Sequence, residues 1–354
     1  MSASHLAPVL SAILAPVAFA GPIVLEPVAI KDPQINNLEA VTFLKPKGWK
    51  VTGGVQWYPD LTNLACLEIK VSNPDSLEQI ETFPWCYGCW FSNPVVPMTK
   101  GTNYMGSIVR PVIEHPHDVV EELTLPNLRA KYRPKITGYQ DMPEVAKAHS
   151  ASMGGAKVKA GRVRIEYAID GQAVEEDIYL AVFVTSANLG VNNCIAYTWG
   201  PVSTPFALRA AKGKLDAATP LMLASVHSAQ IQPKWFGQYM YVSDLYQNRM
   251  AQGIANAKKI SDTITRNSDE IFKMYSDAYW SRQKSQDRVH QQFSDYIRGV
   301  ARYDTPHEKY PVQLPSGYKN AWSSASGEYI LSDEAGFDPN TGGTRSWTQL
   351  KMAK

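Results

Sequence analysis

The sequence of 354 residues lacks an excess of charge of either sign. Its 35 basic and 33 acidic residues leave a formal net charge of +2, which provides no electrostatic basis for binding nucleic acid or an anionic membrane. Beyond its first twenty residues, the chain also lacks any run of the roughly 18 apolar residues that a transmembrane helix needs. We therefore expect no nucleic-acid partner and no membrane-spanning segment in the mature protein.

Signatures of the common enzyme classes are missing as well. The sequence contains no G-x-S-x-G, no H-E-x-x-H, no phosphate-binding glycine loop and no G-x-G-x-x-G. No other group of residues points to a reaction, and no cofactor is implied. The sequence therefore favours a non-catalytic binding or scaffolding protein over an enzyme, with an enzyme that lacks these motifs as the alternative.

The first twenty residues are apolar and contain neither lysine nor arginine. The stretch "HLAPVLSAILAPVAFAG" brings the small residues Ala18 and Ala20 to the positions that a signal peptidase requires. We expect residues 1–20 to be a signal peptide that is cleaved before Gly21. A buried or disordered N-terminal arm is the alternative, because the usual basic start is absent. Export would place the protein in the periplasm or outside the cell.

Cysteine is scarce, and in an oxidising compartment cysteines tend to pair. The disulfide candidates are Cys66, Cys86, Cys89 and Cys194. Two of them lie in "FPWCYGCWFSNP", residues 83–94, whose C-x-x-C spacing also occurs in thiol–disulfide enzymes. Those enzymes place the motif at the start of a helix, which Pro94 and Pro97 prevent here. Structural disulfides are therefore the favoured interpretation, and the connectivity stays open.

A metal site at the same cysteines is a weaker alternative. His115 and His117 would face one side of a strand, and together with Cys86 and Cys89 they could form a four-ligand zinc site. A single C-x-x-C without a second pair is a weak signal, and Pro116 between the histidines disturbs a strand. The runner-up function is accordingly a thiol–disulfide or metal-dependent factor that uses the Cys86–Cys89 region.

Hydrophobic alternation predicts strands over much of residues 37–232. Residues 21–36 are expected to be an extended lead-in, followed by strands at 41–45, 49–57, 65–72, 163–169 and 174–184. The last two strands flank Asp170-Gly171, a pair that suits a type I′ turn. Residues 304–354 are expected to form a β-hairpin-rich tail that packs on the rest of the chain, because so short a β unit cannot bury a core alone.

Proline is absent from residues 234–303, which indicates one long helix or a helical hairpin over 233–303. The apolar stripe along this segment is poor in leucine, so it needs cover from the same chain, from a protein partner or from a second copy. The interface candidates are Trp235, Phe236, Tyr239, Ile264, Ile271, Tyr275, Tyr279 and Trp280.

Several stretches resemble a known fold and a known family. "FLKPKGWKVTGGVQW", residues 43–57, resembles the opening of the PsbP/Mog1-like α/β/α sandwich, and "LMLASVHSAQI", residues 221–231, resembles its last helix and strand. The chain as a whole resembles a family of exported bacterial proteins of unknown function, on "FSDYIRGVARYD" and "VQLPSGYKNAWSSASGEYILSDEAGFDPN". The resemblance implies an α+β protein: such a sandwich, a long helical segment and a small β-rich tail. It also implies an assembly or binding role, and it brings no catalytic residues.

Overall fold

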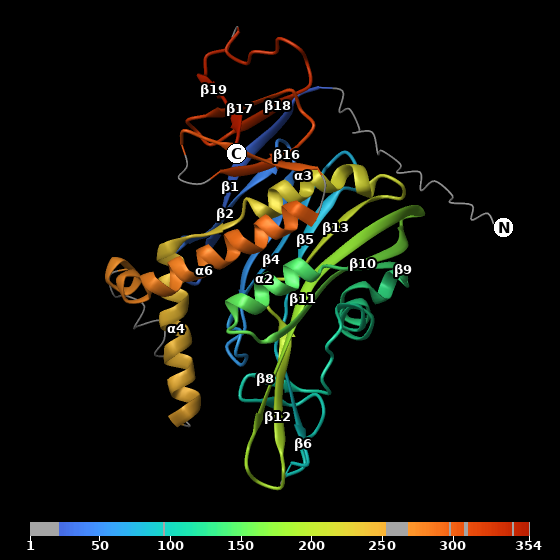
Figure 1. Cartoon of the computed structure of the whole chain (residues 1–354), viewed down its shortest axis with the longest axis vertical. Helices are drawn as coiled ribbons and strands as arrows, with labels where there is room; N and C mark the ends of the chain where they lie inside the picture. The colour runs from blue at the N-terminus through green and yellow to red at the C-terminus, as the bar shows by residue number, and fades with distance from the viewer. Residues whose placement is uncertain are drawn as a thin grey trace, which may run out of the picture.

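In a computed structural model, the described part of the protein consists of three β-sheets, whose strands are mostly antiparallel, and a set of helices (Figure 1). The structure describes residues 21–94, 96–252, 268–296, 299–307, 311–341 and 343–353. The predicted signal peptide, residues 1–20, and the interface candidate Ile264 lie outside these ranges. Among the described residues, no helix combines the length and the apolar character needed to cross a bilayer.

The first sheet joins the beginning of the chain to its end (Figure 1). Ile23 pairs with Leu331, so the segment expected to be a lead-in is a central strand that hydrogen-bonds to the tail. The strand order is β14, β2, β1, β18, β17, β19. The bounds are β1 Ile23–Asp32, β2 Leu38–Pro46, β14 Gln230–Ile231, β17 Asn320–Ser324, β18 Tyr329–Ser332 and β19 Trp347–Gln349. This sheet therefore unites segments that lie about 300 residues apart in the sequence.

The second sheet is the largest and carries the long hairpin that the sequence predicts. Its path runs β3, β4, β5, β13, β11, β12, β6, β8, β7, and β10 and β9 extend it beside β11. The bounds are β3 Lys50–Trp57, β4 Ala65–Ser72, β5 Gln79–Thr82, β6 Gly88–Ser92, β7 Asn103–Tyr104, β8 Ser107–Val109, β9 Lys135–Asp141, β10 Lys157–Ile169, β11 Gln172–Asn188, β12 Ile195–Pro201 and β13 Phe206–Ala211. Asp170 and Gly171 both have positive φ between β10 and β11, which confirms the predicted turn.

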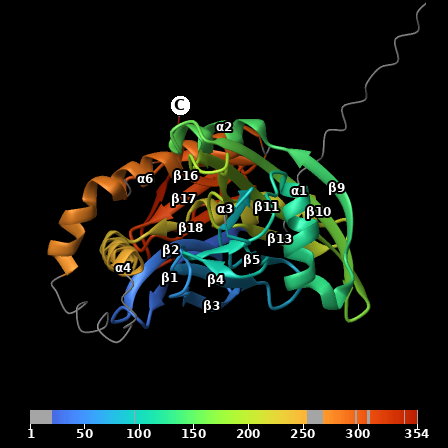
Figure 2. The ribbon, with the colours of Figure 1, turned by 90° about the horizontal axis from the view of Figure 1, so that it is seen from below.

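Alternation along β10 and β11 gives the second sheet two buried faces. Val163, Ile165 and Val174 are fully buried on one face. There they pack under a π-helix, η1 (Val120–Arg129), which follows α1 (Pro116–Val119) and precedes a short 3₁₀ turn, η2 (Ala130–Tyr132). The other face carries Ala160 and Ala181 and packs against α2 (Pro143–Ser152), α3 (Leu215–His227) and the first sheet. Figure 2 shows α1 on one side of the molecule and α6 on the other.

The predicted α/β/α sandwich with a long helical segment and a small β-rich tail is wrong. More of the described residues lie in strands, which form three sheets, than in helices, and none of the described helices is as long as the predicted segment. The third sheet, β16, β15, β20, uses strands β15 Val300–Asp304, β16 Val312–Pro315 and β20 Lys351–Met352. The physical reason is that the lead-in and the tail supply hydrogen-bonding partners to strands of the main body, rather than forming separate layers.

No single helix runs through the described part of residues 233–303. The structure has α4 (Pro233–Gln252) and α6 (Ser268–Tyr296), which pack against each other. Gly237 of α4 lies directly against the backbone of α6. A Cβ at this position would be only 2.9 Å from the Cα of Phe272. The two helices therefore cover part of each other's surface. Gly237 makes the close contact possible, because it has no side chain.

Candidate functional site

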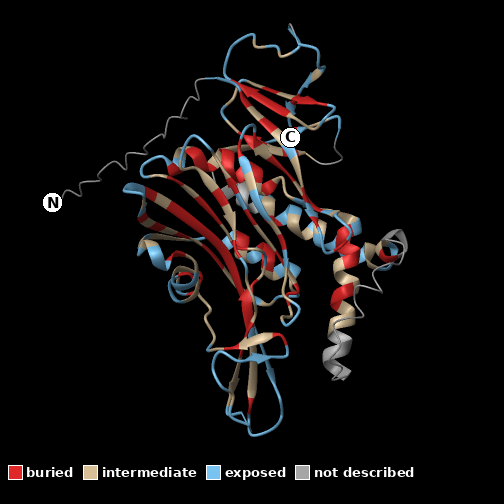
Figure 3. Cartoon of the chain, turned by 180° about the vertical axis from the view of Figure 1, so that it is seen from behind, coloured by how far each residue is buried: buried red, intermediate tan, exposed pale blue. Residues whose placement is uncertain are grey.

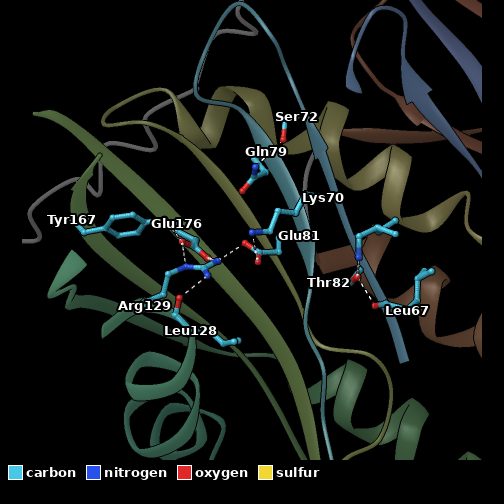
Figure 4. Close-up of polar contacts among 11 residues, drawn as sticks. Leu67, Lys70, Ser72, Gln79, Glu81, Thr82, Leu128, Arg129, Tyr167 and Glu176 are labelled. Carbon is cyan, nitrogen blue, oxygen red and sulfur yellow. Dashed lines mark hydrogen bonds and ion pairs between the residues drawn. The ribbon is translucent and has the colours of Figure 1, made fainter. Parts of the chain in front are cut away.

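A buried arginine fixes the helical layer of α1 and η1 to the second sheet (Figure 4). Arg129, at the end of η1, donates from Nε to Glu176 Oε2 at 3.0 Å and from Nη2 to Glu176 Oε1 at 2.7 Å. Its Nη2 also donates to Glu81 Oε2 at 2.6 Å, and its guanidinium lies 5.2 Å from the centre of the Phe83 ring. Burial lowers the pKa of Arg129, but the hydrogen bond and charge of Glu176 outweigh it and raise the pKa.

The opposite face of β11 has a matching arrangement. Asp177 is fully buried and accepts from Arg164 Nε at 2.7 Å and from Arg162 Nη1 at 3.2 Å. Arg164 also pairs with Asp216, which ties the sheet to α3. Successive residues of a strand point to opposite faces, so Glu176 and Asp177 anchor one layer each. These buried charges are therefore structural ties between layers.

A pocket of about 810 Å³ opens beside α1. It is lined by Pro111, Val112, Ile113, Glu114, His115, His117, Asp118, Glu122, Tyr139 and Lys159. The His115 ring lies 4.8 Å from the Tyr139 ring, and Lys157 donates to Glu114 at 2.6 Å. This hydrogen bond from Lys157 lowers the pKa of the Glu114 carboxyl.

Possible ligands for a cation meet beside this pocket, which His117 and Asp118 also line. His117 Nδ1 lies 3.1 Å from Asp118 Oδ1 and 3.9 Å from Glu121 Oε2, and these three ligand atoms lie within 4.8 Å of one another. His117 and Glu121 are four residues apart, so they share one face of the helical segment. The side chains are 32%, 51% and 62% exposed. Exposed carboxylates of this kind are common on protein surfaces, and the group alone does not define a metal site.

The structure does not assemble the predicted zinc ligands. Among the described residues, the only group of three or more candidate ligand atoms within 4.8 Å is the one at His117, and it includes neither Cys86 nor Cys89. His115 and His117 lie at the start of α1 and not on a strand, because Pro116 occupies the first helical position. Asp118 follows in the first turn.

All four cysteines are free thiols here; three of them are buried, and Cys86 is half-buried. Cys66 Sγ accepts from Asn63 Nδ2 at 2.9 Å, while Cys89 is buried in β6 and Cys194 is buried just before β12. Burial raises the pKa of Cys66 to about 11, and burial also raises the pKa of Cys86 and of Cys89. A raised pKa is the opposite of what a reactive thiol needs. The disulfide pairing stays a prediction.

The "FPWCYGCW" stretch forms the base of a projecting part of the second sheet, residues 88–94, 96–110 and 184–199, which we call the finger. It extends from the lower end of the body in Figure 1. Tyr87 packs edge-on against Phe183, with the two ring centroids 5.4 Å apart. Gly88 lies under the buried ring of Trp199, since a Cβ there would be 2.4 Å from that ring. Tyr87 and Gly88 of the motif therefore pack against β11 and β12, the strands that carry the finger.

The surface of the finger is rich in rings and poor in charge. Lys100 and Arg110 are the only charged residues of 88–110 and 184–199, in a chain of which 19% is charged. The Lys100 ammonium lies 5.8 Å from the Trp90 ring, and Phe91 packs edge-on against Tyr104 at 5.3 Å. Figure 3 shows that the finger is largely exposed or half-buried. Sequence reasoning missed this surface, because the lack of carboxylates in the two segments becomes informative only when the segments are seen to pair.

Most of the predicted interface residues on α4 and α6 pack inside the chain. Trp235 is buried and donates from Nε1 to Asp32 at 2.7 Å, as does Trp57 at 2.9 Å. The other candidates with buried side chains are Phe236, Ile271 and Tyr279, and those with half-buried side chains are Tyr239 and Tyr275. Trp280 is 51% exposed on α6. The two helices therefore offer less free apolar surface than the sequence indicates.

Comparison of the chain with protein-family models, with curated proteins and with solved structures found no match. The resemblance to a family of exported bacterial proteins therefore stays a prediction, and the functional argument depends on the surfaces described above.

Proposed function

We propose that this chain is an exported, non-catalytic binding or scaffolding protein of the cell envelope or exterior, which engages its partner through the finger. The observation that carries the proposal is the finger itself, a projecting β ribbon without a carboxylate. Its rings are mostly half-buried, and its aliphatic side chains Val96, Leu189 and Val191 are exposed. A soluble protein that exposes such a patch usually uses it for contact. The finger stands away from the helical layers, so a partner can reach it without displacing them (Figure 1).

The buried charges support a role without catalysis. Glu176 and Asp177 are each engaged by arginine, and Asp32 accepts from two indole groups. Groups tied into layers in this way stabilise the fold and are not positioned to react with a substrate. The alternative, a thiol–disulfide or metal-dependent factor at Cys86 and Cys89, needs a thiolate, whereas burial raises the pKa of both thiols.

Export is compatible with the fold. The first strand, β1, begins at Ile23, so cleavage before Gly21 would leave every described element intact. The apolar stretch that ends at Ala20 fits a secretory signal. Edman sequencing of protein recovered after export should begin at Gly21, and a chain that begins at Met1 would contradict export by cleavage.

Binding through the finger can be tested with matched variants. Leu189→Gln with Val191→Gln changes two exposed residues of the finger, and Met274→Gln with Trp280→Gln changes two exposed residues of α6. Purified wild-type protein should bind the envelope fraction of its own cell, the finger variant should lose that binding, and the α6 variant should keep it. Equal binding by all three proteins would overturn the proposal. So would cysteine-dependent reduction of an insulin disulfide, because it would show a thiol enzyme.

A further inference from the structure

Three of the five exposed large apolar side chains in the described part of the finger lie beyond one end of its strands, and the other two, Tyr104 and Met105, lie at the turn between β7 and β8. Asn188 of β11 pairs with Ile195 of β12, and Ile195 pairs with Ser92 of β6, so three strands end in one row. The chain beyond this row contains Leu189 and Val191 in one loop and Val96 in the other. Their exposed fractions are 51%, 54% and 68%. The row thus carries an aliphatic tip that is built from two separate segments.

Aromatic side chains form the next layer behind the tip. Phe91 and Trp90 lie one and two residues inside Ser92, and Tyr197 pairs with Trp90 on the neighbouring strand. At a rise of about 3.3 Å per residue, these rings lie roughly 3 to 7 Å behind the strand ends. The cation of Lys100 lies over the Trp90 ring.

This order of layers distinguishes a bilayer from a protein partner. Protein interfaces concentrate tryptophan, tyrosine and arginine at their centre, whereas the end of the finger is aliphatic and its rings stand behind. A segment that enters a bilayer places aliphatic side chains deepest, aromatic rings at the headgroup level and basic side chains near the phosphates. A carboxylate would be repelled by anionic headgroups, and the finger contains none.

We propose that the finger inserts its aliphatic tip, Val96, Leu189 and Val191, into the surface of a phospholipid bilayer that carries anionic headgroups. This inference depends on the proposed function, because it names the partner of the same surface. Insertion is shallow: the tip reaches the acyl boundary, the rings of Trp90 and Tyr197 stay at the interface, and Lys100 remains beside the phosphates. The body of the protein stays in water.

Sedimentation with lipid vesicles tests the inference. The probe is a vesicle made of equal parts of phosphatidylcholine and phosphatidylglycerol, incubated with the processed protein recovered after export. Each of Leu189 and Val191 is half exposed, so their replacement by Gln should weaken partitioning by about thirtyfold. Met274→Gln with Trp280→Gln removes the same number of exposed apolar side chains from α6 and should leave partitioning unchanged. Replacing phosphatidylglycerol by phosphatidylcholine should weaken wild-type binding by about tenfold.

Folding controls and a second variant keep the test decisive. Both double variants change exposed positions and should retain the wild-type circular dichroism spectrum. Lys100→Gln leaves the tip intact and should reduce only the preference for anionic lipid. The inference is overturned if wild-type protein does not sediment with the vesicles, or if the finger variant binds as well as wild type. It is also overturned if light scattering shows that the finger instead joins two copies of the chain.

The vesicle and envelope experiments separate the two proposals. If wild-type protein ignores pure vesicles but binds the envelope fraction through Leu189 and Val191, the membrane inference fails and a protein partner takes its place. If neither preparation binds the finger, both the inference and the proposed function are wrong.

Discussion

Replacing Arg129 by Met removes the guanidinium that ties η1 to the second sheet and should destabilise the protein strongly. Glu176, whose side chain is 1% exposed, would lose two hydrogen bonds from Arg129, and Glu81 would lose one. Removing one partner of a buried ion pair costs about 3–5 kcal/mol, because the remaining charge is buried without compensation. Since whole proteins are stable by only about 5–15 kcal/mol, the loss should be evident in the unfolding midpoint.

Urea unfolding followed by circular dichroism and by tryptophan fluorescence measures this loss. Lys147→Met is the matched control, because Lys147 pairs with Glu144 at 4.0 Å on the surface with 81% and 55% of their side chains exposed. That variant should change the free energy of unfolding by less than about 0.5 kcal/mol. Arg129→Met combined with Glu176→Leu should recover most of the loss, because the buried charge of Glu176 is removed and Glu81 keeps its ion pair with Lys70 at 3.3 Å. The reasoning fails if Arg129→Met costs less than about 1 kcal/mol, or if the double variant is no more stable than the single one.

Three further changes have defined outcomes. Gly88→Ala should destabilise the folded protein by about 1–3 kcal/mol, because the new methyl group meets the Trp199 ring. Gly54→Ala is the control and should be tolerated, because a methyl group there meets nothing within 4 Å. Thermal unfolding compares the two variants. Burial lowers the pKa of His227 to about 4, and His290 stacks on it at 4.9 Å. Below pH ~6.5 the unfolded chain therefore binds more protons than the folded one. The stability of the fold should be full above pH ~6.5 and should fall as the pH decreases from about 6.5 to 4. A melting temperature that is constant over this range would refute the argument. Burial raises the pKa of the Cys89 thiol. Alkylation of Cys89 in the reduced folded protein at neutral pH should therefore be at least about tenfold slower than its alkylation in urea. Equal rates would contradict this expectation.

Local patterns in the sequence predicted local structure well. The alternation of apolar residues along 163–184 and the Asp170-Gly171 turn predicted a hairpin, and β10 and β11 confirm it. The strands at 41–45, 49–57 and 65–72 are also confirmed. These elements depend on neighbours within a few residues, which a sequence displays directly.

Long-range pairing decided what the sequence could not show. Ile23 and Leu331 form one ladder although nothing in either segment indicates the other, so the lead-in and the tail were assigned to separate layers. The finger posed the same difficulty. Its lack of carboxylates has meaning only once 88–110 and 184–199 are known to pair. The large ring of Trp235 is costly to expose, so the sequence makes it a candidate for either an interface or the core. The buried carboxylate of Asp32 decides for the core, because it accepts a hydrogen bond from the indole inside the chain.

The most direct test of the central claim is photo-crosslinking in the exporting cell. A benzophenone amino acid is placed at Val191, at the tip of the finger, or at Met274, which is 67% exposed on α6. The account predicts that irradiation yields adducts from position 191, with lipid if the membrane inference is right and with protein if another partner binds, and few from position 274. Adducts that form equally at both positions, or at position 274 alone, would contradict the claim that the finger is the contact surface.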